Sequence, residues 1–120
     1  MCADIVNQGD EIISVGQLNQ QAKTLLENQF RGVSVIGEIS NIARPSSGHI
    51  YFTLKDEDGA IRCAMFRNQN LRLNFEPQNG DQCILKGQVS LYVPRGDYQL
   101  IVSSMQPAGA GNLMHQFEEL

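Results

Sequence analysis

Aromatic and basic side chains alternate with apolar ones in two neighbouring segments of the sequence. Tyr51 and Lys55 occupy alternate positions of one segment, and Arg62 and Phe66 occupy alternate positions of the next. Because alternate side chains of a β-strand point to the same face, all four are expected on one surface. Exposed rings stack on nucleobases, at about 1 to 3 kcal/mol per base, and Lys and Arg offset phosphate charge. The pattern therefore predicts a surface suited to a single-stranded nucleic acid.

Further side chains of the same types lie in or beside the turns that flank these segments. They are Arg44, His49, Tyr92, Arg95 and Tyr98. All nine residues are candidate nucleic-acid contacts, with Tyr92 and Tyr98 as secondary candidates. A plainer alternative stays open, in which the rings pack across neighbouring strands, Phe66 is buried under a covering segment and His49 is an ordinary strand-edge residue.

The sequence offers no convincing arrangement for catalysis. Its two histidines, His49 and His115, are not accompanied by a recognisable nucleophile and base. The acidic run 56–58 precedes Gly59, and acidic residues before a glycine favour a hairpin turn in which they stay solvated. Neither standard spacing of a glycine-rich phosphate loop is present. We therefore expect a binding domain and not an enzyme, with no metal and no cofactor.

The three cysteines, Cys2, Cys63 and Cys83, lack the CxxC or Cys/His spacing of a zinc site. Cys63 and Cys83 fall at apolar positions of alternating segments, where a free thiol packs as a small hydrophobic group. Reduced thiols in a cytoplasmic protein are the expectation.

A helix is predicted ahead of these segments, at about residues 15–30. Ser14 and Gln17 have the capping-box spacing, and Ile13 and Leu18 stand at the hydrophobic-staple positions. Gly32 is expected to end the helix. One apolar stripe at helical spacing is expected to pack against another part of the molecule, and it comprises Val15, Leu18, Ala22, Leu25 and Leu26.

From Val33 onward the apolar period changes to two, which predicts β-strands. Loop 45–48 and the Asp58-Gly59 pair separate the first three strands, residues 68–75 form a short helix or irregular crossover, and the turn 94–97 separates the last two strands. The strands are expected at 33–42, 49–55, 60–67, 82–92 and 98–105. Three strands, a crossover and two strands predict a mainly β fold, the five-stranded Greek-key barrel called the OB-fold. OB-folds bind oligonucleotides on the face of their second and third strands.

Length, composition and charge set the class of protein. With 120 residues, 42% of them hydrophobic and 18% charged, the chain is expected to form a globular domain. No apolar run reaches the roughly 18 residues of a membrane helix, and no basic segment leads into an apolar stretch, so a soluble, cytoplasmic protein is expected. The net charge is −4, but residues 31–100 hold eight bases against seven acids. A phosphate-binding surface is therefore compatible with the acidic total.

The predicted organisation has three parts. An N-terminal arm and capping helix occupy residues 1–31, the OB-fold occupies 32–107, and a linker with the start of a second helix occupies 108–120. The helical spacing of Leu113, Met114 and Phe117 stops at Leu120 without a cap, so we expect the natural chain to continue. A docked C-terminal helix is the alternative.

Five strings of residues carry a family resemblance. They are GEISN at 37–41, PSSGHIYFTLKD at 45–56, RCAMFRN at 62–68, PRGDYQ at 94–99 and MQP at 105–107. In this order and spacing they resemble the N-terminal domain of the large subunit of bacterial exonuclease VII, and the resemblance covers residues 13–120.

This resemblance implies an OB-fold that binds single-stranded DNA and is joined to a separate catalytic region and to a helical part that engages several small subunits. The parent enzyme would degrade single-stranded DNA to oligonucleotides in the cytoplasm. No catalytic motif of the family falls within these residues. A competing hypothesis is a protein-interaction OB module that docks its own catalytic region or a partner subunit, and RNA binding is a third.

Overall fold

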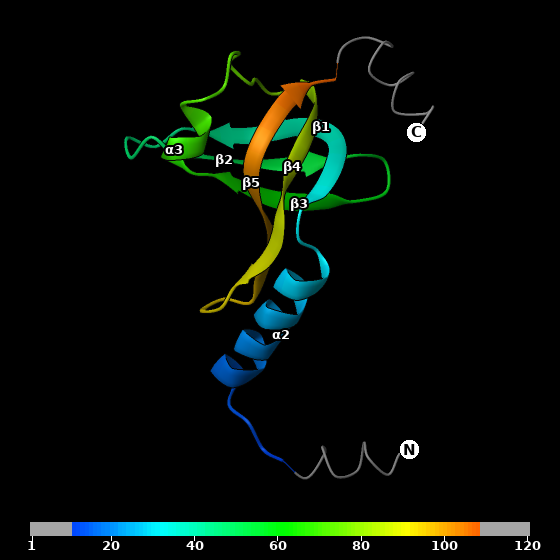
Figure 1. Ribbon diagram of the computed structural model, residues 1–120, viewed down its shortest axis with the longest axis vertical. Coiled ribbons are helices and arrows are strands. Elements are labelled where there is room, and N and C mark those ends of the chain that lie inside the picture. The colour runs from blue at the N-terminus through cyan, green and yellow to red at the C-terminus, as the bar shows by residue number, and fades with distance from the viewer. Residues whose placement is uncertain (1–10, 109–120) are drawn as a thin grey trace.

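Five strands and two helices make up the part of the chain that this computed structural model describes, residues 11–108 (Figure 1). The predicted helix at Leu113 to Phe117 and the cysteine at Cys2 lie outside these residues. The elements are α2 (Val15–Gln29), β1 (Val33–Ala43), β2 (Ile50–Lys55), β3 (Ala60–Met65), α3 (Arg67–Asn70), β4 (Gln82–Tyr92) and β5 (Asp97–Pro107).

The strands close into a barrel in the order β1-β2-β3-β5-β4. Neighbouring strands are antiparallel except β3 and β5, which run parallel. This arrangement confirms the predicted five-stranded Greek-key barrel. Strand β3 ends at Met65 and not at the predicted Arg67. Phe66 has an extended backbone, but it is the N-cap residue of α3, which is a single helical turn. The predicted crossover therefore begins with that turn.

Two local irregularities let the strands curve into a closed barrel. A bulge in β1 follows Ser40, where Asn41 adopts a left-handed φ of 53°. In β4 the register shifts at Gly87, and a Cβ atom there would lie 2.2 Å from the carbonyl oxygen of Ile101. Only glycine permits this close approach of two backbones.

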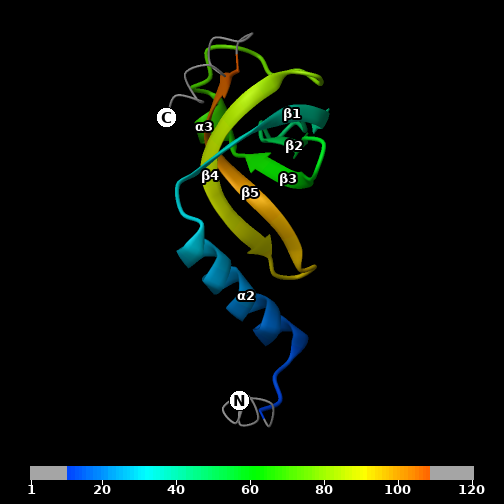
Figure 2. The same ribbon diagram turned by 90° about the vertical axis from the view of Figure 1, so that its right-hand side faces the viewer.

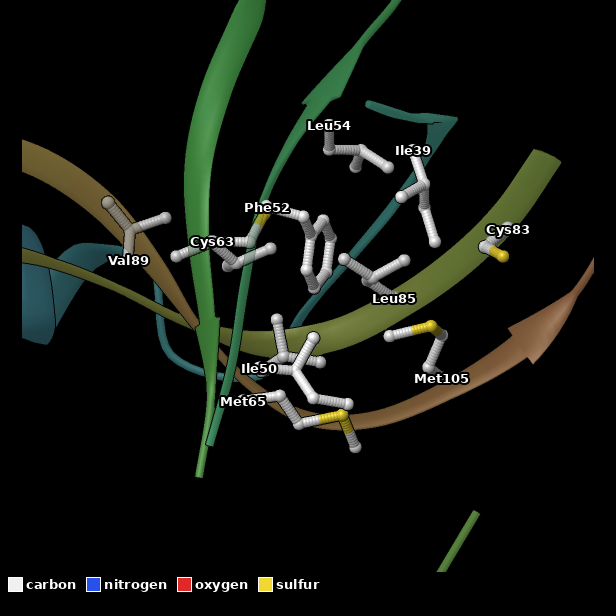
Figure 3. Packing of buried hydrophobic residues seen from close by; sticks show 12 residues of the cluster. Ile39, Ile50, Phe52, Leu54, Cys63, Met65, Cys83, Leu85, Val89 and Met105 are labelled. Carbon is white, nitrogen blue, oxygen red and sulfur yellow. The ribbon is translucent and has the colours of Figure 1, made fainter. Parts of the chain in front are cut away.

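The side chains inside the barrel form one apolar core (Figure 3). Phe52 is 1% exposed and Met65 and Leu85 are fully buried. The apolar residues that alternate with Tyr51 and Lys55 in β2 are Ile50, Phe52 and Leu54, and all three are buried, whereas Ile61 at the start of β3 is only partly buried at the edge of the core. The opposite row of β2 is thereby left for the outer surface.

Both core cysteines are free, as predicted, and burial raises the pKa of Cys63 to about 12 and that of Cys83 to about 11. An unfolded chain has the ordinary thiol value of 9.0, so above about pH 9 it loses protons that the folded chain keeps. Stability is therefore expected to fall between about pH 9 and 11, by at most about 1.4 kcal/mol per pH unit per thiol.

Urea denaturation at a series of pH values, comparing the protein with Cys63→Ala/Cys83→Ala, isolates the thiols from the other groups that titrate in alkali. The wild-type chain should lose stability more steeply than the variant. Parallel pH dependences would refute the contribution of the buried thiols.

Helix α2 begins as predicted. The Ser14 hydroxyl accepts a hydrogen bond from the Gln17 amide at 3.0 Å, and the Ser14 amide donates to Gln17 Oε1 at 2.8 Å. This reciprocal capping box satisfies two of the amides that every helix leaves free at its start.

The apolar stripe of α2 does not pack as expected. Only Leu26 contacts the core, while Val15, Leu18 and Leu25 are 74%, 55% and 63% exposed. Polar contacts hold the helix beside the β4–β5 hairpin, and the helix projects away from the barrel (Figure 2). Asn19 Nδ2 donates to the Val93 carbonyl at 2.9 Å, and the Ser90 hydroxyl donates to Glu27 Oε2 at 2.7 Å. None of the described helices is long and apolar enough to cross a membrane.

Candidate nucleic-acid interface

The hairpin of β2 and β3 places the predicted basic residues on its outer face. Thr53 lies opposite Arg62, and Lys55 closes the same outward row of β2. The turn is fixed by Asp56, whose Oδ1 accepts hydrogen bonds from the amides of Asp58 and Gly59 at 2.8 and 2.9 Å. The acidic run therefore builds the hairpin, as the sequence predicted.

Three rings meet at the other end of this face, and we call His49, Tyr51 and Phe66 the aromatic cluster. The His49 ring lies 6.3 Å from Tyr51 and 5.3 Å from Phe66 between centroids, both in edge-to-face geometry. Phe66 is 43% exposed, so the alternative in which it is buried is wrong. The cluster presents aromatic surface on which a base can stack.

His49 is oriented by the backbone that follows Phe66. The Arg67 amide donates to His49 Nδ1 at 2.9 Å, which leaves the hydrogen of the neutral ring on Nε2. The Arg67 side chain packs on Gly48, whose φ is 93°. This exposed cation beside the aromatic cluster is not among the residues predicted from the sequence, although its position directly after Phe66 could have indicated it.

Arg44 is near the aromatic cluster but is partly engaged. Its guanidinium donates to the Pro77 carbonyl and lies 3.8 Å from the Glu76 carboxylate. Arg44 and His49 line one pocket of about 350 Å³ between loop 44–49 and the segment before β4. Arg44 therefore holds these two segments together and has less of its charge free for a phosphate.

The β4–β5 turn lies at the opposite end of the barrel from loop 44–49. Gln99 in β5 pairs with Arg62 in β3, and the strands run parallel, so β5 begins where β3 begins. Strands β4 and β5 have 11 residues each against six in β2 and β3, and their hairpin extends past the barrel (Figure 1). Tyr92 and Arg95 are carried away from the aromatic cluster, and Arg95 pairs with Asp97 at 3.5 Å.

Tyr98 occupies a different position from its neighbours in the hairpin. It is in the same row of β5 as the buried Leu100 and Val102, and it lines a second pocket together with Lys55. The structure thus joins Tyr98 to the β2–β3 face through Lys55, whereas Tyr92 and Arg95 stay apart from it.

The positive charges of this face are available to a ligand. Among the ion pairs of residues 11–108, none involves Lys55, Arg62 or Arg67. All three side chains are exposed, and Glu38 is the residue of β1 that faces Lys55 across the sheet. The expectation of no metal and no cofactor stays a prediction.

A closed β1-β2-β3-β5-β4 barrel with rings and unpaired cations outside β2 and β3 is a nucleic-acid-binding domain of the OB class. Comparison with family models agrees, because the model described as OB-fold nucleic acid binding domain matches residues 13–106. The chain belongs to this family.

Relatives of known name extend the assignment and confirm the resemblance seen in the sequence. The exodeoxyribonuclease 7 large subunit of Pasteurella multocida is 59% identical over 111 residues, which is 92% of this chain and 25% of that protein. The subunit of the same name from Haemophilus influenzae is 58% identical over 111 residues, with the same coverage. The chain therefore spans about a quarter of the length of these relatives.

Solved structures share the fold at low sequence identity. A replication protein A heterotrimer bound to ssDNA superposes with a TM-score of 0.56 at 16% identity, covering 73% of this chain and 67% of that chain. The Stn1-Ten1 complex of S. pombe gives 0.55 at 16% identity, with 74% and 67% covered. These matches support the barrel assignment.

Proposed function

We propose that this chain binds single-stranded DNA as the substrate-holding module of a longer bacterial, cytoplasmic exodeoxyribonuclease. The observation that carries the proposal is the aromatic cluster lying on the same hairpin face as the unpaired Lys55 and Arg62. The name of the relatives supports DNA as the substrate, and the remaining three quarters of their length leave room for a catalytic region and for contacts with small subunits.

Each side chain of the face has a role in this proposal. Tyr51 and Phe66 stack on bases, and Lys55 and Arg62 contact phosphates. His49 orients the two rings and offers its Nε2 hydrogen to the strand. Stacking and phosphate contacts do not distinguish one base from another, so binding is expected to tolerate many sequences. Arg44 and Tyr98 contact the strand at the margins, whereas Tyr92 and Arg95, which the long hairpin carries away from the aromatic cluster, are given no contact in this proposal.

Fluorescence anisotropy with a labelled oligothymidylate of about 15 nucleotides tests this function. Binding is expected with a Kd of about 10⁻⁴ to 10⁻⁶ M, the range of non-specific contacts at physiological salt. With Lys55, Arg62 and the neighbouring Arg67 each neutralising a phosphate, affinity should fall about 20-fold between about 50 and 200 mM salt. Matched duplex DNA and single-stranded RNA serve as controls. Absence of binding at low salt, or equal binding to the duplex, would refute the proposal.

A second candidate function is protein interaction, and the exposed stripe of α2 favours it. Val15, Leu18 and Leu25 place aliphatic surface in solvent, where such patches commonly mark protein contacts. In this alternative the module docks its own catalytic region or a partner subunit. Binding to such a partner would depend little on salt, in contrast to binding to phosphates.

A further inference from the structure

One end of the barrel core is open to solvent. A pocket of about 390 Å³ lies where the β2–β3 turn and the start of β5 meet. Its walls include apolar side chains at the edge of the core that are only partly buried, among them Val33, Val35 and Ile61. A volume of this size is within the range of pockets that hold small organic ligands.

The described helices do not close this end of the barrel. The single turn of α3 belongs to the other end, where Asn70 Nδ2 donates to the Gly48 carbonyl at 2.6 Å. Helix α2 contacts β4 and projects beyond the hairpin, and only Phe30, just after the helix, lines the pocket. Within residues 11–108, the apolar wall and the aromatic rim of the pocket therefore remain accessible to a ligand.

The rim of the pocket combines two rings with one cation. Phe30 and Tyr98 are 46% and 51% exposed and line the opening together with Lys55. Lys55 is also the last residue of the outward row of β2 that carries Tyr51. The pocket is thus continuous with the proposed DNA-binding face, at the end away from the aromatic cluster.

We propose that this pocket receives one nucleobase of the bound strand, stacked against Tyr98 or Phe30, while Lys55 holds the adjoining phosphate. The inference rests on the proposed function and adds a base subsite to it. Asp56 is at the rim, and its carboxylate disfavours a phosphate inside the pocket, so the uncharged base enters and the phosphate stays outside. Because the opening is wide, the polar edges of the base keep their water and any base is accepted.

The two tyrosines of the hairpin provide a matched pair for testing the subsite. Tyr92 and Tyr98 are 50% and 51% exposed and stand on neighbouring strands, but only Tyr98 lines the pocket. Tyr98 pairs with Leu91 and Tyr92 with Asp97, so the two rings leave opposite faces of the hairpin. Tyr98→Ala should weaken binding of the oligothymidylate about tenfold, as expected for the loss of one stacked base. Tyr92→Ala should change it less than about twofold.

A second substitution tests the subsite even if Tyr98→Ala does not fold. Ala60 is exposed, lines the pocket and pairs with Lys55 in the outward row, so Ala60→Leu narrows the mouth of the pocket without entering the core, and it should also weaken binding. Circular dichroism and thermal melting verify the fold of each variant. Equal effects of Tyr92→Ala and Tyr98→Ala, or unchanged affinity in folded Ala60→Leu, would overturn the subsite.

Photo-crosslinking can refute the base subsite without refuting the proposed DNA binding. An oligonucleotide carrying 5-iodouracil in place of thymine is irradiated on the wild-type chain, and the modified peptides are identified by mass spectrometry. Adducts on Tyr98 or Phe30 support the base subsite. Adducts confined to Tyr51 and Phe66 would refute the subsite and leave DNA binding intact, whereas failure of the oligonucleotide to bind overturns both.

Discussion

Replacing Tyr51 and Phe66 together with alanine should weaken binding of the oligothymidylate about a hundredfold and leave the barrel folded. Each ring lost from a stack costs about 1 to 3 kcal/mol, and about 1.4 kcal/mol corresponds to a factor of ten. Both rings lie on the outer face of the hairpin, and among the described aromatic groups each is in edge-to-face geometry with His49 alone. The same anisotropy titration measures the loss.

Two control variants test whether the loss of binding comes from the aromatic rings. Tyr51→Phe keeps the ring and should keep affinity within about twofold, because stacking needs the π-face and not the hydroxyl. Arg62→Ala removes a cation and should reduce the dependence of affinity on salt, by about 0.7 in the logarithmic slope. If the folded double variant bound as tightly as the wild type, the β2–β3 face would be excluded as the DNA site.

The barrel and its central face could be predicted because local patterns determine them. The alternation of Ile50, Phe52 and Leu54 with Tyr51 and Lys55 separates core from surface within a single strand. The hairpin follows from Asp56 and its turn, and the start of α2 follows from its capping box. In each case the interacting groups are close in the sequence, so spacing alone carries the information.

The failures concern contacts between residues that are distant in the sequence. The stripe of α2 predicts packing, but nothing local shows that the helix docks through Asn19 and Glu27 and leaves Leu18 and Leu25 outside. Arg44 stays a predicted phosphate contact, but its ion pair with Glu76, 32 positions further along the chain, could not be predicted from local spacing.

The lengths of the strands explain why some of the predicted site residues lie away from the β2–β3 face. Tyr92 and Arg95 have side chains suited to nucleic acid and lie in or beside the β4–β5 turn. That turn would flank the β2–β3 face if β4 and β5 were as short as β2 and β3. Because β4 and β5 are five residues longer than β2 and β3, the turn lies beyond the face. Only Tyr98, nearer the barrel, stays beside it.

Phe52→Ala should destabilise the domain by about 3 to 5 kcal/mol, the usual cost of removing a buried phenyl group and leaving a cavity. Phe52 is 1% exposed, is among the largest of the fully buried side chains, and pairs with Cys63 across the hairpin (Figure 3). A domain of this size has about 5 to 15 kcal/mol of stability in total, so the variant would retain a small margin. Urea denaturation of the two proteins measures the difference.

The same substitution at Phe66 provides the matched control, because Phe66 is 43% exposed on the other side of the sheet. Phe66→Ala should change stability by no more than about 0.5 kcal/mol, as is usual for surface positions, while weakening DNA binding about tenfold. Phe52→Ala, measured in conditions where it is folded, should bind DNA with nearly wild-type affinity. The two variants thus separate stability from binding by the face of the sheet on which the ring lies. A large loss of stability in Phe66→Ala, or a stable Phe52→Ala, would show that the inward and outward rows of this hairpin have been assigned the wrong way round.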